Sequence, residues 1–190
     1  MEEKSFKNIF TVPNLITFTR ILFTPFIFFA LLKNDEYYSK IALILITAAL
    51  LSDFFDGYLA RKYKQISKWG KILDPIADKI MINGMAIILS LTRDFPIWLT
   101  LTILSRDFLI ILLGSIMVFK KVDYVPQSNI FGKFALIFIV LSMLVYILDW
   151  EVIQSVKLPL ILGAVALILI SGVTYFIRFI NLESKTSSRD

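Results

Sequence analysis

Two stretches decide the fold of this chain: residues 41–60, IALILITAALLSDFFDGYLA, and residues 72–91, ILDPIADKIMINGMAIILSL. Each has about the length that an α-helix needs to cross the hydrocarbon core of a bilayer. Each also carries two aspartates, Asp53 and Asp56 in the first and Asp74 and Asp78 in the second. Carboxylates inside such segments are costly and are typical of functional sites. The two stretches therefore predict membrane-spanning helices that carry an acidic site.

The composition of the whole chain agrees with an integral membrane protein. Hydrophobic residues make up 57% of the 190 residues and charged residues only 18%, and the mean hydropathy is +0.77. Soluble domains have more charged residues and fewer apolar ones. The chain has no cysteine and no histidine, which excludes disulfides, thiolate nucleophiles, imidazole bases and Cys/His zinc sites. Any metal ion must therefore be held by oxygen.

Apolar windows predict an all-α protein with six transmembrane helices, at about 14–33, 40–61, 72–92, 96–119, 131–149 and 157–180. Lysine and arginine concentrate at 61–71 and 120–133, and such loops face the cytoplasm. Both termini and the acidic helix ends are then cytoplasmic in a multi-pass cell-membrane protein. We expect one domain over 1–190, with a short interfacial helix at 1–13, no cleaved signal peptide, and a polar tail at 181–190.

The four aspartates are spaced so that they can meet at one point. Residues three or four apart share a helix face, so Asp53 lies with Asp56 and Asp74 lies with Asp78. Four carboxylates in a partly desolvated place repel each other unless cations neutralise them. Oxygen ligands without nitrogen or sulfur suit Mg²⁺ or Mn²⁺. The sequence therefore predicts a site for one of these ions, formed by Asp53, Asp56, Asp74 and Asp78.

Small and basic residues lie beside these aspartates. Gly57, Ala60 and Gly70 leave space near the backbone, and Arg61 adds a positive charge. Carboxylates for cations, small residues for space and a cation for phosphate together predict a metal-diphosphate site. Taken alone, Gly57 and Gly70 are as typical of a turn or a packing position as of a ligand site. A divalent-cation transporter could use the same carboxylates, but it gives no reason for the small residues and Arg61.

The string Asp53-x-x-Asp56-Gly57-x-x-Ala60-Arg61, eight residues, Gly70-x-x-x-Asp74-x-x-x-Asp78 resembles the complete signature of the CDP-alcohol phosphotransferase family. The resemblance implies a six-helix membrane domain over nearly the whole chain, commonly a homodimer. It also implies a reaction in which an alcohol displaces CMP from a CDP-linked lipid. By the same resemblance, the four aspartates bind metal, Asp78 is the general base, and the residues that contact the CDP group are Gly57, Ala60, Arg61 and Gly70.

Three further cations bear on which alcohol is the acceptor: Arg106, Lys133 and Arg178. Together they could bind a phosphomonoester such as glycerol 3-phosphate. Arg106 could instead pair with Asp107 as a structural contact. The segments VPNLITFTRILFTPFIFF and SGVTYFIRF resemble the branch of the family that makes phosphatidylglycerophosphate. We therefore expect transfer of the phosphatidyl group from CDP-diacylglycerol to glycerol 3-phosphate.

Other acceptors stay open at this point. The glycerophosphate branch often has arginine followed by glutamate in its fourth span, whereas this chain has Arg106 followed by Asp107. Phosphatidylglycerol, the acceptor of a cardiolipin synthase, is one alternative, and serine and inositol phosphate are others. The expected partners are the two substrates, membrane lipids and a second copy of the chain, with no nucleic acid.

Overall fold

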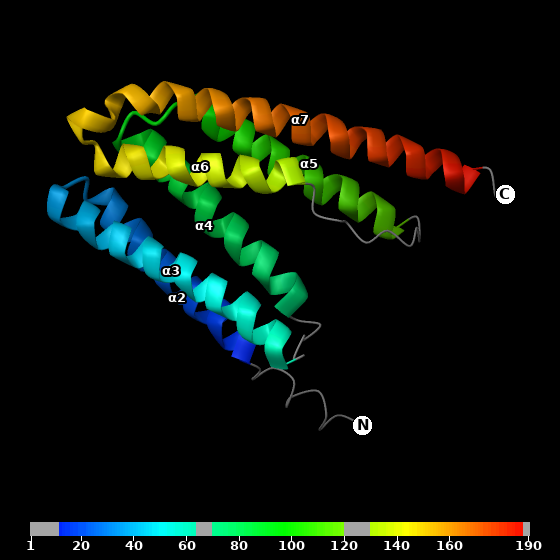
Figure 1. The fold of residues 1–190 in the computed structure, drawn as a ribbon, viewed down its shortest axis with the longest axis horizontal. Coiled ribbons are helices and arrows are strands. Elements are labelled where there is room, and N and C mark those ends of the chain that lie inside the picture. Colours follow the sequence, from blue (N-terminus) through cyan, green and yellow to red (C-terminus); the bar gives the residue numbers. More distant parts are fainter. Residues whose placement is uncertain (1–11, 64–69, 120–129, 188–190) are drawn as a thin grey trace. The chain divides into compact units, whose positions relative to one another are not determined.

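The computed structural model of the protein describes the backbone of residues 12–63, 70–119 and 130–187 (Figure 1). Side chains are described for residues 20–52, 76–112, 130–177 and 180. Within these ranges the chain is helical and has no strand, which confirms the predicted all-α class. The helices are α2 (Val12–Leu32), α3 (Glu36–Tyr63), α4 (Gly70–Thr92), α5 (Ile97–Phe119), α6 (Ile130–Leu148) and α7 (Gln154–Ser187), with a 3-10 turn, η1 (Glu151–Ile153), before α7.

Each of the six predicted spans corresponds to one helix, and the main difference is at the end of α7. The apolar window ends at 180, but α7 continues to Ser187. Glu183 and Lys185 are good helix formers, so the helix continues where the hydropathy falls. Within the described ranges, two segments are long and apolar enough to cross a membrane, Ile130–Leu148 and Glu151–Ile177. Six spans and their orientation stay a prediction, and the interfacial helix at 1–13 falls almost wholly outside the described residues.

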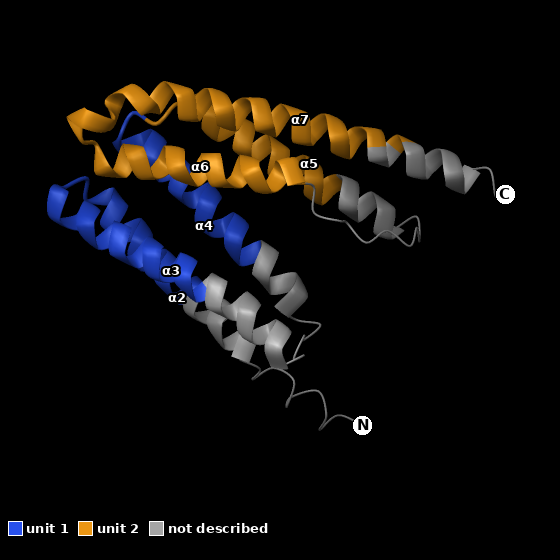
Figure 2. Ribbon diagram, viewed as in Figure 1, with its two compact units in different colours: residues 1–94 blue, residues 95–190 orange. Residues whose placement is uncertain are grey.

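The chain divides into two compact units, residues 1–94 and 95–190 (Figure 2). In the first unit, α2 packs against both α3 and α4, and in the second, α7 packs against α6 and α5. Buried residues recur three or four positions apart along each helix, which is the spacing of one helix face. In the first unit these residues are Ile27, Ala30, Leu31, Ala42, Ile46, Ala49, Met85, Ala86 and Leu89. Small alanines in this core allow helices to approach closely.

Short polar residues end three of the helices. Asn34, Asp94 and Asp149 have φ values of 48°, 53° and 45°, in the left-handed region that asparagine and aspartate tolerate best among non-glycine residues. The N-terminus of the following helix, α3, is capped by Asp35, whose carboxylate accepts a hydrogen bond from the Tyr37 N–H at 3.0 Å. Asn34 and Asp149 thereby allow the chain to turn between consecutive helices of the same unit.

Gly84 of α4 provides the space that Phe28 of α2 occupies. A Cβ atom at position 84 would overlap Cζ of Phe28, so Gly84→Ala forces this ring or the helix to move. At Gly172 of α7, no atom lies within 4 Å of an added Cβ. Both substitutions add the same helix propensity. We expect Gly84→Ala to be less stable than Gly172→Ala by about 1–3 kcal/mol, the usual cost of overpacking.

Thermal unfolding of the two purified variants in the same detergent measures this difference. Gly172→Ala serves as the matched control and should unfold at or slightly above the temperature of the unchanged protein. Equal melting temperatures for the two variants would contradict the close contact between α2 and α4 at Gly84.

Candidate functional site

The four predicted metal ligands lie on two helices that are consecutive in the chain. Asp53 and Asp56 are on α3, and Asp74 and Asp78 are on α4. Because both segments are α-helical, each pair shares a helix face, as the spacing predicts. Only residues 64–69 join the end of α3 to the start of α4, so the connected ends are at most about 25 Å apart. The backbone therefore allows the two pairs to approach each other.

Most of the predicted signature residues lie outside the described side chains. This applies to Asp53, Asp56, Gly57, Ala60, Arg61, Gly70 and Asp74, and also to Arg178 near the end of α7. Their convergence on one ligand therefore stays a prediction. The structure does describe the side chains of Asp78, Arg106 and Lys133.

The Asp78 carboxylate lies at the contact between α2 and α4. Its Oδ1 accepts a hydrogen bond from Nη1 of Arg20, and the two groups form an ion pair. The Asp78 side chain is 41% exposed, whereas that of Arg20 is only 4% exposed. A buried guanidinium requires a counter-charge, because an unpaired ion in an apolar interior is strongly destabilising. The predicted base is therefore an accessible carboxylate held by an enclosed cation.

Arg20 was not among the site residues predicted from the sequence. It lies inside the apolar segment TFTRILFTPFIFF of α2, where neither the first nor the last turn explains a charge. An isolated ionisable residue in an apolar helix commonly faces a partner in the protein interior. That signal could have marked Arg20, but its partner is 58 residues away in the chain.

An apolar groove is lined by residues of the same two helices, α2 and α4. It has a volume of about 260 Å³ and is lined by Ile21, Thr24, Pro25, Phe28, Ile76, Ala77 and Ile80. Ile21 follows Arg20 in the chain, and Ala77 precedes Asp78. The groove and the ion pair thus lie on the same two helices, and the residues that line the groove are almost all apolar.

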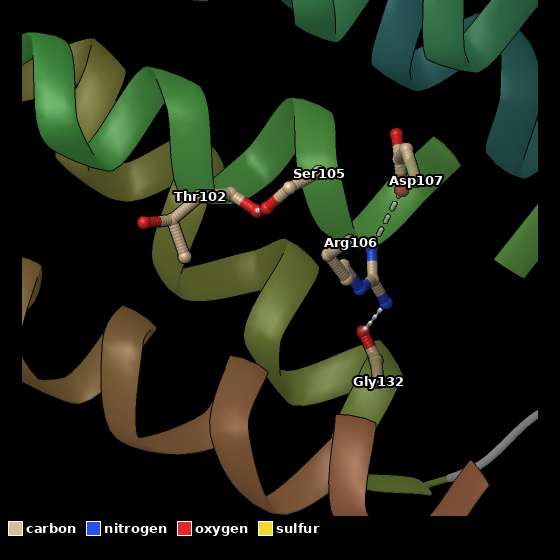
Figure 3. A network of polar contacts seen from close by, with 5 residues as sticks. All are labelled: Thr102, Ser105, Arg106, Asp107 and Gly132. Carbon is tan, nitrogen blue, oxygen red and sulfur yellow. Dashed lines mark hydrogen bonds and ion pairs between the residues drawn. The ribbon is translucent and has the colours of Figure 1, made fainter. Parts of the chain in front are cut away.

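The second unit holds a separate polar cluster around Arg106 of α5 (Figure 3). Its Nη1 donates to Oδ1 of Asp107 at 3.1 Å, and its Nη2 points to the carbonyl oxygen of Gly132 on α6 at 3.4 Å. The first contact confirms the pairing with Asp107 that the sequence left open. The second is at the long limit of a hydrogen bond. Nε of Arg106 is buried and has no hydrogen-bond partner among the described residues, so one donor of the guanidinium is left unsatisfied.

Gly132 and Ser171 complete this cluster. A Cβ atom at position 132 would lie 3.1 Å from Oγ of Ser171 and 3.2 Å from Nη2 of Arg106. Ser171 is fully buried on α7, and its Oγ has no hydrogen-bond partner among the described residues. Lys133 follows Gly132 and is exposed. The described contacts of the Arg106 side chain are to Asp107 and Gly132, so a pocket that Lys133 shares with Arg106 stays a prediction.

The oxygen donors fit a divalent metal ion. The chain has no histidine or cysteine, and Asp78 presents an accessible carboxylate of the kind that Mg²⁺ and Mn²⁺ prefer. Among the residues with described side chains, no three acidic, histidine or cysteine residues gather at one point. The side chains of the other three aspartates are not described, so Asp78 is the one predicted metal ligand whose side chain the structure places.

Comparison with known proteins assigns the family. The model of the CDP-alcohol phosphatidyltransferase family matches residues 10–175, which include the whole aspartate signature, Arg20 and Arg106. A protein of Aquifex aeolicus named CDP-diacylglycerol--glycerol-3-phosphate 3-phosphatidyltransferase is 34% identical over 88% of this chain and 94% of its own length. A Rickettsia felis protein of the same name is 40% identical over 63% of this chain and 65% of its own.

Relatives with a second name also match. A Streptomyces coelicolor protein named cardiolipin synthase (CMP-forming) is 31% identical over 67% of this chain and 60% of its own length. The family resemblance carried by the aspartate signature is thereby confirmed, and the chain belongs to the CDP-alcohol phosphatidyltransferase family.

Proposed function

We propose that this protein transfers the phosphatidyl group from CDP-diacylglycerol to glycerol 3-phosphate, releasing CMP and forming phosphatidylglycerophosphate. The observation that carries the proposal is the likeness to the Aquifex protein named for this reaction, which extends over 88% of the chain. The complete aspartate signature and the apolar groove lined by α2 and α4 are consistent with a CDP-linked lipid as donor. Membership of a transferase family gives a reason for Gly57, Ala60, Arg61 and Gly70, which a cation transporter does not.

The signature residues have separate tasks in this reaction. Members of the family generally use a divalent metal ion, and Asp53, Asp56, Asp74 and Asp78 would hold Mg²⁺ or Mn²⁺ here. When bound, the ion supplies positive charge to the diphosphate. Gly57, Ala60 and Gly70 leave space for the CDP group, and Arg61 adds charge for its phosphates.

Asp78 takes the proton of the acceptor hydroxyl as that oxygen attacks the β-phosphorus of the donor. A new bond forms between the acceptor oxygen and this phosphorus, and the bond from the phosphorus to the bridging oxygen breaks. CMP departs with the bridging oxygen and its electron pair. The carboxylate is suited to this step because 41% of its side chain is exposed.

Arg106 recognises the phosphate of the acceptor. Asp107 occupies Nη1 at 3.1 Å, whereas Nε has no described partner and Nη2 has only the 3.4 Å contact to the Gly132 carbonyl. Nε and Nη2 form one edge of the guanidinium, and such an edge binds two phosphate oxygens in parallel. Lys133 and Arg178 add positive charge to the same pocket. A phosphomonoester acceptor uses these groups better than an uncharged alcohol does.

The protein works as a homodimer in the cell membrane, with six spans and its active site facing the cytoplasm. The basic segments 61–71 and 120–133 support this orientation, because lysine and arginine concentrate on the cytoplasmic side. Two helices long and apolar enough to cross a membrane support the location.

CMP release from CDP-diacylglycerol tests the function directly. The purified protein is given Mg²⁺ and one acceptor at a time: glycerol 3-phosphate, phosphatidylglycerol, serine or inositol phosphate. We expect release with glycerol 3-phosphate alone. Release with phosphatidylglycerol alone would instead support a cardiolipin synthase, the name of the Streptomyces relative. Failure with every acceptor would overturn the proposed donor as well.

Replacing Arg106 with glutamine should raise the KM for glycerol 3-phosphate by about tenfold or more, since a hydrogen bond to a charged group contributes about 1.5–3 kcal/mol. The KM for CDP-diacylglycerol should change less. Arg106→Lys, which keeps the charge beside Asp107, should recover part of the affinity. Equal changes in both KM values, or none in either, would assign Arg106 to structure rather than to the acceptor.

A further inference from the structure

Arg20 carries a charge that the packing of α2 does not require. Its side chain is 4% exposed in a helix that is otherwise apolar through this region. Taking a guanidinium out of water costs several kcal/mol, and well-packed apolar residues in place of a buried ion pair are often at least as stable. A buried pair is therefore weak evidence for a stabilising role, and another use of Arg20 has to be considered.

The two members of the ion pair differ in their exposure. Arg20 is enclosed at 4%, but 41% of the Asp78 side chain is open. Arg20 is the fixed member, because burial limits its rotamers. It contacts Oδ1 of Asp78. The carboxylate is thus held through one oxygen while part of it remains accessible.

We propose that Arg20 is a positioning residue for the transfer reaction: by holding Oδ1 of Asp78, it fixes the carboxylate that accepts the proton of the acceptor alcohol. The inference rests on the proposed function, in which Asp78 is the base. Arg20 acts through Asp78 and binds neither substrate. A catalytic group has to be held close to its productive geometry by its neighbours, and an error of about 1 Å can reduce a rate on the order of a hundredfold.

Three variants separate positioning from other roles. Arg20→Gln removes the charge and the fork of donors. Arg20→Lys keeps the charge as a single ammonium group, so it should restore part of the contact. Lys33→Gln is the control, because it removes one positive charge directly after the end of α2. Lys33 is exposed, and its Nζ lies 5.1 Å from the centre of the Phe29 ring, away from Asp78.

The measurements are kcat, both KM values and the melting temperature of each purified variant. For Arg20→Gln we expect kcat to fall on the order of a hundredfold, with both KM values within about twofold of the unchanged protein. The kcat of Arg20→Lys should reach about a tenth of that of the unchanged protein or more. Lys33→Gln should leave kcat unchanged. Arg20→Lys also keeps the test valid if Arg20→Gln does not fold.

Two results would overturn the proposal while leaving the proposed function intact. A rise in the KM for CDP-diacylglycerol with little change in kcat would make Arg20 a direct ligand of the donor. An unchanged kcat per folded molecule, with a lower melting temperature, would make the pair purely structural. If the unchanged protein releases no CMP with any acceptor, the proposed function fails first and the inference fails with it. If the unchanged protein turns over with a different acceptor, kcat and KM of the variants are compared with that acceptor instead.

Discussion

Asp78→Asn is expected to abolish CMP release while the protein keeps its fold and part of its affinity for CDP-diacylglycerol. Asparagine has nearly the size of aspartate, and its side-chain oxygen can still accept the hydrogen bond that Arg20 donates to Oδ1. It cannot accept a proton from the acceptor hydroxyl. Because a positioned general base contributes about 10²–10⁴ to a rate, and Asp78 is also a metal ligand in the proposed site, kcat should fall at least about a thousandfold.

The measurement pairs turnover with binding. CMP release gives kcat, and titration with CDP-diacylglycerol in the absence of acceptor gives the donor affinity. Asp35→Asn is the matched control, because it makes the same chemical change at an aspartate that only caps α3 through the Tyr37 N–H, and asparagine caps equally well. If Asp78→Asn lost donor binding as completely as turnover, Asp78 would serve in binding rather than as the base.

The helices were predictable because each apolar run is close to the length of a membrane span. The alternation of six such runs with short polar loops marks where each helix begins and ends, and the structure has one helix for each. The end of α7 at Ser187 was missed because hydropathy reports where apolar residues stop, whereas a helix continues through polar residues of good propensity. The all-α class therefore followed from local sequence, but one helix end did not.

The signature could be predicted because its residues are close together on α3 and α4, where helical spacing alone places them on shared faces. The pairing of Arg106 with Asp107 was a stated alternative, since these residues are neighbours in the chain. The contacts of Arg20 with Asp78 and of Arg106 with Gly132 join residues 58 and 26 positions apart. Such pairs depend on which helix faces pack together, and a single sequence does not give that information.

Removing divalent metal is expected to stop the reaction, and restoring Mg²⁺ or Mn²⁺ is expected to restart it. Four acidic ligands in one site repel each other without cations, and the sequence provides no histidine or cysteine to bind a different kind of ion. Arg20, which is paired with Asp78, offsets only part of this charge, because one cation cannot balance four carboxylates. With excess chelator, CMP release should fall below about 1% of its original rate, within the range that metal-ion catalysis commonly spans.

A second readout separates metal binding from turnover. Without either substrate, Mn²⁺ at about a hundred times its Kd should stabilise the folded protein by about 2.7 kcal/mol, seen as a higher melting temperature. Asp78→Asn should reduce this shift, whereas Asp35→Asn should preserve it, because Asp35 lies at the opposite end of α3 from the signature. Turnover that persists in chelator, or an equal shift in both variants, would contradict a metal site at Asp78. The remaining carboxylates would then need protons or basic side chains to offset their charge, and the reaction would have to proceed on the cations of the protein alone.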